Sequence, residues 1–319
     1  MLSCIFIKAR TTMQKVLITG GAGFIGSHTA DLLLQYGIPV RVLDNLSSGF
    51  RHNLPQNHAL LEFVEGDIRN KDIVNQCMDG VSHCLHLAAQ VSVVASLEDP
   101  EFSAQQNIIG FLNVIEAVKN HGAKRLVYAS SAAIYGNPVT IPLVENVEKT
   151  QLSPYGLEKQ VNEQYAELYR YLYRVSSLGQ RFFNVFGPRQ DPKSPYAGVI
   201  ALFVDRISEG RPLTVFGDGK QTRDFIYVGD VAAANVAALQ SPDVEGACNI
   251  ATGVKTSLLD LIQVLSDITE NQSEISFDAA REGDIVDSLA FTEKMNNELG
   301  IIAQTSLKQG LKKLIASSR

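Results

Sequence analysis

The chain has 319 residues, of which 45% are hydrophobic and 19% are charged. This is enough apolar material for one large core or two modest ones, which excludes a small scaffold held together by disulfides. The 28 basic and 34 acidic residues give a formal charge of -6, so no global positive field is present to attract nucleic acid or anionic lipid. Any phosphate binding must therefore be local.

The cysteines and the hydropathy pattern predict a reduced, soluble protein. Cys4, Cys77, Cys84 and Cys248 lie far apart and form no spacing typical of a zinc site or a redox pair, so we expect no metal. No stretch approaches the roughly 18 apolar residues that a membrane span needs. The sequence thus predicts a cytoplasmic protein that binds neither membrane nor nucleic acid.

The first twelve residues differ from a secretion signal, because their apolar residues precede their basic ones. We expect residues 1–12 to form an extension outside the fold. Met13 stands directly before the first strand-like run and is an alternative start of the functional chain.

From Lys15 onward, short β-branched runs alternate with amphipathic stretches, which is typical of βαβ units on a parallel sheet. The expected strands are 15–19, 39–44, 61–65, 83–87, 125–129 and 175–183. The two longest expected helices are 101–121 and 155–173, which carry apolar residues at a spacing of three and four. The sequence therefore predicts an α/β fold, with a doubly wound parallel sheet of the Rossmann type over residues 13–180.

After about Asn184 the regular alternation ends, and glycine and proline become frequent. We expect a smaller C-terminal α/β domain over residues 181–319. Segments after residue 224 are expected to return to the first domain, and the crevice between the two domains is expected to hold a ligand.

A glycine-rich loop joins the first expected strand to the first expected helix. Gly20, Gly23 and Gly26 allow a tight turn, a close approach of the backbone to a pyrophosphate, and close packing of the helix on the strand. The helix N-terminus then offers unpaired N–H groups to the phosphates. Asp44, at the end of the next strand, can accept hydrogen bonds from an adenosine ribose but repels a 2′-phosphate. The pattern therefore favours NAD over NADP.

Further loop residues at strand ends fit the same cofactor. Asn45 and the 47–49 loop are suited to the adenosine, Asp67 can meet the adenine amino group, and the small side chains of 87–90 let the cofactor lie against the backbone. The full set expected to bind the cofactor is Gly20, Gly23, Phe24, Ile25, Gly26, Asp44, Asn45, Ser48, Gly49, Asp67, Ile68, Leu87, Ala88, Ala89, Gln90, Asn107, Tyr155 and Lys159.

Tyr155 and Lys159 stand four residues apart, on one face of a helix. A phenol with a pKa of about 10 is a poor base at neutral pH, so a neighbouring cation is needed to stabilise the phenolate. Lys159 can supply this charge and also bind the nicotinamide ribose. Ser130 and Ser131 follow the fifth strand, where one hydroxyl can share the reacting proton with Tyr155.

Together these residues resemble the extended short-chain dehydrogenase/reductase superfamily, and within it the nucleotide-sugar 4-epimerases related to UDP-glucose 4-epimerase. The resemblance runs from about Met13 to the C-terminus. Beyond the glycine loop and the Tyr/Lys pair, it rests on four motifs, which are residues 130–136, 181–190, 217–225 and 281–284.

The resemblance implies Ser131 as the catalytic serine, Tyr155 as the base and Lys159 as its partner. It also implies a substrate-binding set, in which Arg223 and Arg281 can clamp a diphosphate, Phe216 can stack on uracil and Asp284 can accept from a ribose hydroxyl. That set is Ser92, Ser131, Tyr155, Asn184, Val199, Thr214, Phe216, Arg223, Arg281, Asp284 and Ser288. The implied partners are a UDP-sugar and a second copy of the chain, paired through the helices 101–121 and 155–173. Alternatively, the apolar faces of these two helices pack against the sheet of their own chain.

The residues after Ser131 distinguish between the activities of similar enzymes. Similar 4,6-dehydratases carry an acid and a base where this chain has Ala132 and Ala133, and decarboxylating relatives keep a glutamate at the second position. The alanines therefore favour epimerisation through a transient 4-keto sugar. A UDP-glucuronate 4-epimerase or decarboxylase and a non-catalytic NAD-dependent regulator remain alternatives. Ala133 disfavours the decarboxylase, and the intact Ser131, Tyr155 and Lys159 set disfavours the regulator.

Ser288 is expected to select the sugar. In similar epimerases the matching position borders the C2 substituent, where a tyrosine restricts the pocket to hexoses and a small residue admits an N-acetyl group. The sequence thus predicts UDP-N-acetylglucosamine and UDP-N-acetylgalactosamine as substrates, with UDP-glucose and UDP-galactose also accepted. The alternative is a surface-loop serine without contact to the substrate. A departure lies at Val93 and Val94, where some relatives carry arginine.

Overall fold

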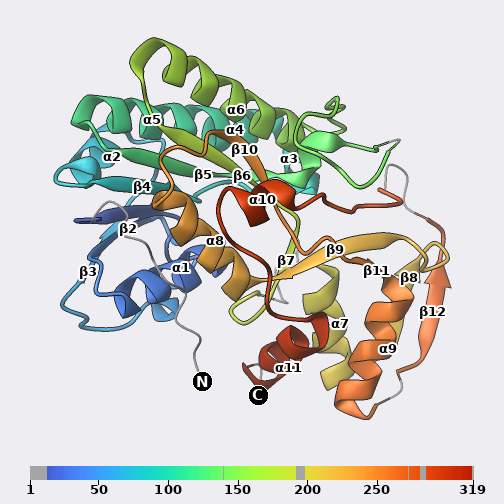
Figure 1. Ribbon diagram of the computed structural model, residues 1–319. Helices are drawn as coiled ribbons and strands as arrows, with labels where there is room; N and C mark the ends of the chain where they lie inside the picture. The colour runs from blue at the N-terminus through green and yellow to red at the C-terminus, as the bar shows by residue number, and fades with distance from the viewer. Residues whose placement is uncertain (1–12, 139, 192–197, 272, 281–284, 318–319) are drawn as a thin grey trace.

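A parallel sheet of seven strands forms the larger part of the molecule (Figure 1). The computed structural model describes residues 13–138, 140–191, 198–271, 273–280 and 285–317. The strand order is β10-β6-β5-β4-β1-β2-β3, and every neighbouring pair is parallel. The strands are β1 (Val16–Thr19), β2 (Val40–Asp44), β3 (Leu61–Glu65), β4 (His83–His86), β5 (Arg125–Ser131), β6 (Ser177–Phe182) and β10 (Gly246–Ile250). This is the doubly wound order, so the predicted fold class is confirmed.

Helices cover both faces of this sheet, as Figure 1 shows. On one face α2 (Lys71–Met78), α5 (Gly110–His121) and α6 (Pro154–Tyr173) bury apolar side chains such as Phe111 and Ala166. On the other face α1 (Phe24–Gln35) and α8 (Val228–Leu239) pack against each other and the strands. The central strands β1 and β4 are buried along their whole length, whereas the edge strand β3 is only partly buried.

Several predicted elements have different boundaries in the structure, and two of these differences concern the candidate site. The helix expected over 101–121 is divided into α4 (Pro100–Ala104), a π-helical turn η2 (Gln105–Ile109) and α5. The strand β5 extends two residues beyond its predicted end, so that Ser130 and Ser131 belong to it. Single π-helical turns are rare and often mark functional sites.

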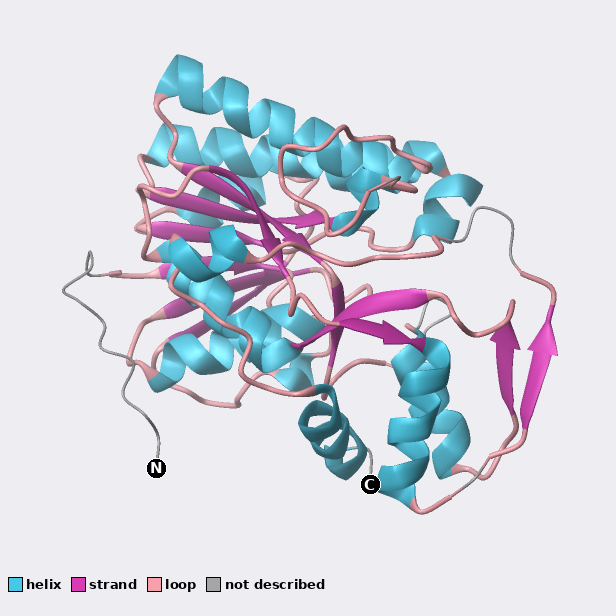
Figure 2. Ribbon diagram, turned by 45° about the vertical axis from the view of Figure 1, so that its right-hand side comes forward, coloured by secondary structure: helices cyan, strands magenta, loops and turns pink. Residues whose placement is uncertain are grey.

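The smaller part of the molecule lies beside the carboxyl ends of the large sheet (Figure 2). It contains a three-stranded sheet of β7 (Asn184–Phe186), β9 (Thr222–Tyr227) and β11 (Lys255–Ser257), and a parallel pair of β8 (Leu213–Phe216) and β12 (Ile275–Asp278). The helices α7 (Val199–Ser208), α9 (Leu258–Thr269) and α11 (Leu307–Ser317) share one apolar core with β7, β8 and β9. Short elements complete the chain: η1 (Arg51–Asn53), α3 (Val93–Glu98), η3 (Ala132–Tyr135) and α10 (Glu293–Asn297).

The two parts are connected more than once. The strand β10 pairs with β6 at the edge of the large sheet, and α8 packs on α1, although both follow residue 224 in the chain. The predicted boundary at residue 180 falls inside β6, and the division into two domains stays a prediction.

Within the described ranges, no helix has the length and apolar character to cross a membrane. The same residues contain no group of three or more His, Cys, Asp or Glu side chains suited to a metal ion. Cys77, Cys84 and Cys248 are buried and unpaired, and the predicted extension, residues 1–12, lies outside the described residues.

Candidate active site

The glycine loop between β1 and α1 forms a cradle that side chains would fill. Gly20 has a positive φ of 71°, and a Cβ atom there would lie 2.6 Å from the backbone nitrogen of Ala88. A Cβ atom on Gly26 would lie 2.2 Å from the carbonyl oxygen of Gly20. Only glycine fits both positions, and the open backbone at the start of α1 suits a pyrophosphate. The cradle therefore fits a dinucleotide.

Asp44 ends β2 beside this loop. Its carboxylate accepts hydrogen bonds from the backbone nitrogens of Ala22, at 2.9 Å, and Leu46, at 2.8 Å. Burial raises the pKa of Asp44, and the backbone donors oppose this effect. The carboxylate is thus held at the predicted position for an adenosine ribose, with part of its acceptor capacity already used by the main chain.

Asn45 and Asp67 are brought together from the ends of β2 and β3. The side-chain nitrogen of Asn45 donates to Asp67 at 3.1 Å, and Arg69 forms an ion pair with Asp67 at 2.9 Å. Desolvation opposes ionisation, but the hydrogen bonds from Arg69 and Asn45 lower the pKa of Asp67 to about 2. An ionised acceptor therefore lies where the adenine amino group is expected.

The π-helical turn places Asn107 against the loop after β4. Its side-chain oxygen accepts from the backbone nitrogen of Gln90 at 2.9 Å, and its side-chain nitrogen donates to the Gln90 carbonyl at 2.9 Å. Asn107 also donates to the buried Glu158 at 2.6 Å. Asn107 thereby fixes the main chain of the predicted 87–90 segment. The remaining predicted cofactor residues lie at the start of α1, in the loop after β2 and beside α5: Phe24, Ile25, Ser48, Gly49 and Ile68.

The helix α6 positions Tyr155 and Lys159. Ser153 caps its N-terminus and accepts from the backbone nitrogen of Gly156 at 3.1 Å, which places Tyr155 in the first turn. The partial positive charge of a helix N-terminus favours a phenolate there. The ammonium nitrogen of Lys159 lies 5.6 Å from the centre of the Tyr155 ring. Burial lowers the pKa of Lys159 to about 8, and the neighbouring Glu158 opposes this shift.

The two serines at the end of β5 face different partners. The Ser131 hydroxyl accepts from the backbone nitrogen of Ala133 at 3.1 Å, and Ser131 and Tyr155 line one cavity. Burial raises the pKa of Tyr155, and the nearby Ser131 hydroxyl lowers it. The Ser130 hydroxyl instead donates to Glu163 at 2.6 Å. Of the two serines, Ser131 is therefore the one that lies beside Tyr155.

A cavity of about 270 Å³ opens beside Ser131 and Tyr155. Among the described residues, its lining includes Asn184, Arg223 and Ser288, which the sequence also predicts to bind substrate. Residues that sequence reasoning did not assign as substrate-binding line it as well: Val91, Val93, Ala132, Ala133, Tyr135, Gly136, Pro138, Leu143, Phe182, Phe183, Ile285 and Asp287. Most of these residues lie within four positions in the sequence of a predicted substrate-binding residue. This proximity is the signal by which they could have been found.

Other predicted substrate residues lie outside this lining. Ser92 caps α3 by accepting from the backbone nitrogen of Ala95 at 3.0 Å. Val199 begins α7, and Thr214 and Phe216 lie on β8 in the smaller part of the molecule. Arg281 and Asp284 lie outside the described residues, so the clamp on the diphosphate stays a prediction.

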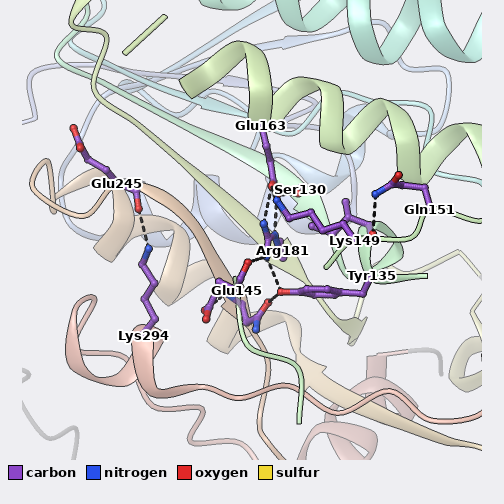
Figure 3. A network of polar contacts seen from close by, with 11 residues as sticks. Ser130, Tyr135, Glu145, Lys149, Gln151, Glu163, Arg181, Glu245 and Lys294 are labelled. Atoms are coloured by element: carbon purple, nitrogen blue, oxygen red, sulfur yellow. Dashed lines mark hydrogen bonds and ion pairs between the residues drawn. The ribbon is translucent and has the colours of Figure 1, made fainter. Parts of the chain in front are cut away.

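A buried polar network (Figure 3) reaches the cavity at Tyr135. Arg181 contacts both carboxylate oxygens of Glu163, at 2.8 and 2.7 Å, and its side chain is only 2% exposed. Arg181 also donates to the hydroxyl of Tyr135 at 2.8 Å and to the carbonyl of Glu145 at 2.7 Å. Sequence reasoning assigned no role to Glu163.

Comparison with known proteins identifies the family. The model of the NAD dependent epimerase/dehydratase family matches residues 16–251. The chain belongs to this family. The predicted resemblance to the nucleotide-sugar epimerases is thereby confirmed. NAD is the cofactor of this epimerase-family enzyme.

Similar proteins cover almost the whole chain. The putative UDP-glucose 4-epimerase of Methanocaldococcus jannaschii is 39% identical over 302 residues, which is 94% of this chain and 97% of the relative. The solved UDP-N-acetylglucosamine 4-epimerase from Methanobrevibacter ruminantium M1, in complex with UDP-N-acetylmuramic acid, has a TM-score of 0.93 at 34% identity and covers 97% of this chain and 99% of its own. The solved UDP-glucuronic acid 4-epimerase from Bacillus cereus, in complex with UDP-glucuronic acid and NAD, has a TM-score of 0.88 at 28% identity. The match covers 95% of this chain and 98% of that one.

The position of Asp44 leads to a prediction about the bound cofactor. Cofactor extracted from the purified epimerase-family enzyme is expected to be NAD, because the carboxylate at the end of β2 repels a ribose 2′-phosphate. Chromatography and mass spectrometry of the extract measure this ratio. Asp44→Ala is expected to release NAD more readily, and recovery of mostly NADP from the unaltered protein would contradict the assignment of Asp44.

Proposed function

We propose that the protein is a UDP-sugar 4-epimerase that interconverts UDP-N-acetylglucosamine and UDP-N-acetylgalactosamine, and also accepts UDP-glucose and UDP-galactose. The proposal about the sugar rests on Ser288, whose small side chain lines the same cavity as Ser131 and Tyr155. Ser288 is 6% exposed, and its backbone nitrogen donates to the Thr222 carbonyl at 3.2 Å. It is therefore a wall residue of the cavity and not a surface-loop serine.

The proposed reaction needs a base at the sugar C4 hydroxyl. Tyr155 takes the proton from this hydroxyl, and Ser131, which lines the cavity beside Tyr155, orients it. Lys159 and the N-terminus of α6 stabilise the phenolate. Bound NAD supplies reversible hydride transfer at C4. A half-turn of the 4-keto sugar within the cavity would present the opposite face of C4 to the cofactor. Return of hydride to that face of C4, with Tyr155 giving its proton back to O4, would then invert C4 without net oxidation.

Arg223 is proposed to bind the diphosphate. It is the cationic side chain among the described residues that line the cavity, and it reaches the lining from β9. A guanidinium matches phosphate oxygens in a bidentate geometry, so a dianionic substrate is neutralised locally in an acidic protein. Arg281 and Asp284 remain the expected partners of Arg223.

The cavity near Tyr155 disfavours the alternative activities. Ala132 and Ala133 offer neither the acid nor the base that elimination of water requires, and Phe182 and Phe183 add apolar surface. With Arg223 used for the diphosphate, the described lining offers no second cation for a sugar carboxylate. We therefore place UDP-glucuronate behind the neutral UDP-hexoses.

A panel of UDP-sugars tests the proposal. The purified protein is incubated separately with UDP-N-acetylglucosamine, UDP-glucose and UDP-glucuronate, and NMR and mass analysis identify the products. We expect C4 epimers of the first two sugars at unchanged mass, and much slower conversion of the third. Preferred conversion of UDP-glucuronate, or a product lighter by water or carbon dioxide, would refute the proposed substrate or reaction.

We also propose that the enzyme is a homodimer paired through α5 and α6. These helices cover one outer face of the large sheet (Figure 1), and large apolar side chains are exposed on α6 and at Ile109, directly before α5. On α6, Leu157, Leu168 and Leu172 share one face, because their spacings of 11 and 15 residues are close to whole turns. Exposed apolar patches of this kind mark interaction sites, and a second copy supplies the same self-complementary helix pair.

Light scattering coupled to size-exclusion chromatography measures this state. A mass of twice 34.8 kDa is expected, and Leu157→Glu combined with Leu168→Glu is expected to yield monomers. Leu202→Glu is the matched control, because Leu202 is a comparably exposed leucine on α7, outside the proposed interface. A monomeric unaltered protein, or dissociation by Leu202→Glu as well, would refute pairing through α6.

A further inference from the structure

Glu163 continues the functional face of α6. Tyr155, Lys159 and Glu163 stand at positions i, i+4 and i+8, which place them in one row along the helix. The carboxylate of Glu163 is 9% exposed and forms a buried ion pair with Arg181. The helix that presents Tyr155 to the cavity therefore carries, two turns later, a buried charge that points toward the sheet.

Glu163 holds the ends of two neighbouring strands. Its oxygen Oε1 accepts from the Ser130 hydroxyl at 2.6 Å and from Arg181 Nε at 2.8 Å, and its Oε2 accepts from Arg181 Nη2 at 2.7 Å (Figure 3). Lys149 contributes a longer ion pair to Oε2, at 3.4 Å. One carboxylate thus ties α6 to both β5 and β6.

The register of the sheet gives this contact its significance. Ser130 of β5 is the direct partner of Arg181 of β6, and the next pair is Ser131 with Phe182. Ser131 and Phe182 both line the cavity. Because successive side chains of a strand point to opposite faces, holding Ser130 and Arg181 on the α6 side fixes the direction in which Ser131 and Phe182 point.

The network also reaches the cavity wall at Tyr135. Arg181 Nη1 donates to the Tyr135 hydroxyl at 2.8 Å, and that hydroxyl donates to Asn249 Oδ1 on β10 at 2.6 Å. Ion pairs buried to this degree commonly give little net stability over an apolar replacement, whereas they fix geometry well. The arrangement therefore suits a positioning function.

We propose that Glu163 is a positioning residue for epimerisation, which acts through Ser130 and Arg181 to set the distance and direction between Ser131 and Tyr155. This rests on the proposed roles of Ser131 and Tyr155. Glu163 is not among the residues that line the cavity. Its effect is expected on the chemical step, because small displacements of reacting groups reduce rates strongly.

Ser130 variants test the proposal with little damage to the fold. Ser130→Ala removes one hydrogen bond to Glu163 and leaves the ion pair intact. We expect kcat to fall by about tenfold or more, with the KM for the UDP-sugar and the NAD content unchanged. Ser130→Thr keeps the hydroxyl and is expected to restore most of kcat.

Ser82→Ala is the matched control. Ser82 is a buried serine whose hydroxyl donates to the carbonyl of Lys15 at 3.0 Å, at the opposite end of the sheet. Its replacement is expected to lower the melting temperature to a similar extent without changing kcat. A kcat for Ser130→Ala within twofold of the unaltered enzyme, or an equal loss of kcat in Ser82→Ala, would overturn the proposal.

Glu163→Gln gives a second readout. It keeps the shape of the side chain but leaves the Arg181 cation buried without its counter-charge, so thermal stability is expected to fall. Measured well below its melting temperature, its kcat is expected to fall further than that of Ser130→Ala, again without a change in KM. If the variant does not fold, the Ser130 series decides.

Turnover by Tyr155→Phe would refute the assigned base, whereas an inactive Tyr155→Phe with a fully active Ser130→Ala would refute only the positioning function.

Discussion

Tyr155→Phe is expected to fold and retain NAD but to lose epimerisation by roughly 10²- to 10⁴-fold, the usual contribution of a general base. The substitution removes the Tyr155 hydroxyl and leaves the ring beside Lys159 in place. Conversion of UDP-N-acetylglucosamine, followed by NMR, measures the loss.

Tyr165→Phe provides the control for this experiment. Tyr165 lies on the same helix and packs at the edge of the apolar cluster under α5 and α6, away from the cavity lining. It is expected to retain the turnover of the unaltered enzyme. Near-normal activity of Tyr155→Phe, or an equal loss in Tyr165→Phe, would remove Tyr155 from the role of base.

Ser288→Tyr is expected to restrict the enzyme to UDP-glucose and UDP-galactose, with loss of activity on the N-acetylated UDP-sugars. The backbone of Ser288 is fixed by its hydrogen bond to Thr222, so a phenol ring at this position must enter the cavity of about 270 Å³. A ring and an acetamido group cannot share that space in a packed site. We expect kcat/KM for UDP-N-acetylgalactosamine to fall at least roughly tenfold, since pockets discriminate by such factors over a single methylene.

UDP-galactose serves as the internal control, because it lacks the acetamido group. Its kcat/KM is expected to stay near that of the unaltered enzyme. Equal losses on both sugars would show that the tyrosine damages the site, and no loss on either would show that Ser288 does not select the sugar.

Much of the fold follows from local sequence patterns. The alternation of β-branched runs with amphipathic stretches, and the glycine spacing at 20, 23 and 26, are each determined by residues close in sequence. The division of the helix 101–121 was not predictable in this way. The π-helical turn at Gln105–Ile109 contains Asn107, whose hydrogen bonds with Gln90 and Glu158 arise only in the folded chain.

The candidate site likewise contains some residues that local sequence patterns predict and others that depend on the folded chain. Tyr155 and Lys159 were recognisable because their spacing is helical, and Ser131 and Asp44 because they end strands of a parallel sheet. Glu163 and Arg181 are 18 residues apart, and their ion pair depends on how α6 lies over β6. Val199, Thr214 and Phe216 were assigned by resemblance alone, and their contribution to substrate binding stays a prediction.

The place of β10 at the edge of the large sheet also determines when that sheet can form. Until residue 250 has been synthesised, β6 is an unprotected edge strand, and until residue 239 the apolar face of α1 lacks its neighbour α8. A nascent or truncated chain that ends near residue 180 therefore exposes both surfaces to unintended pairing. The large sheet can therefore be completed only late in synthesis. The folding of the N-terminal part of this enzyme depends on residues from its C-terminal half.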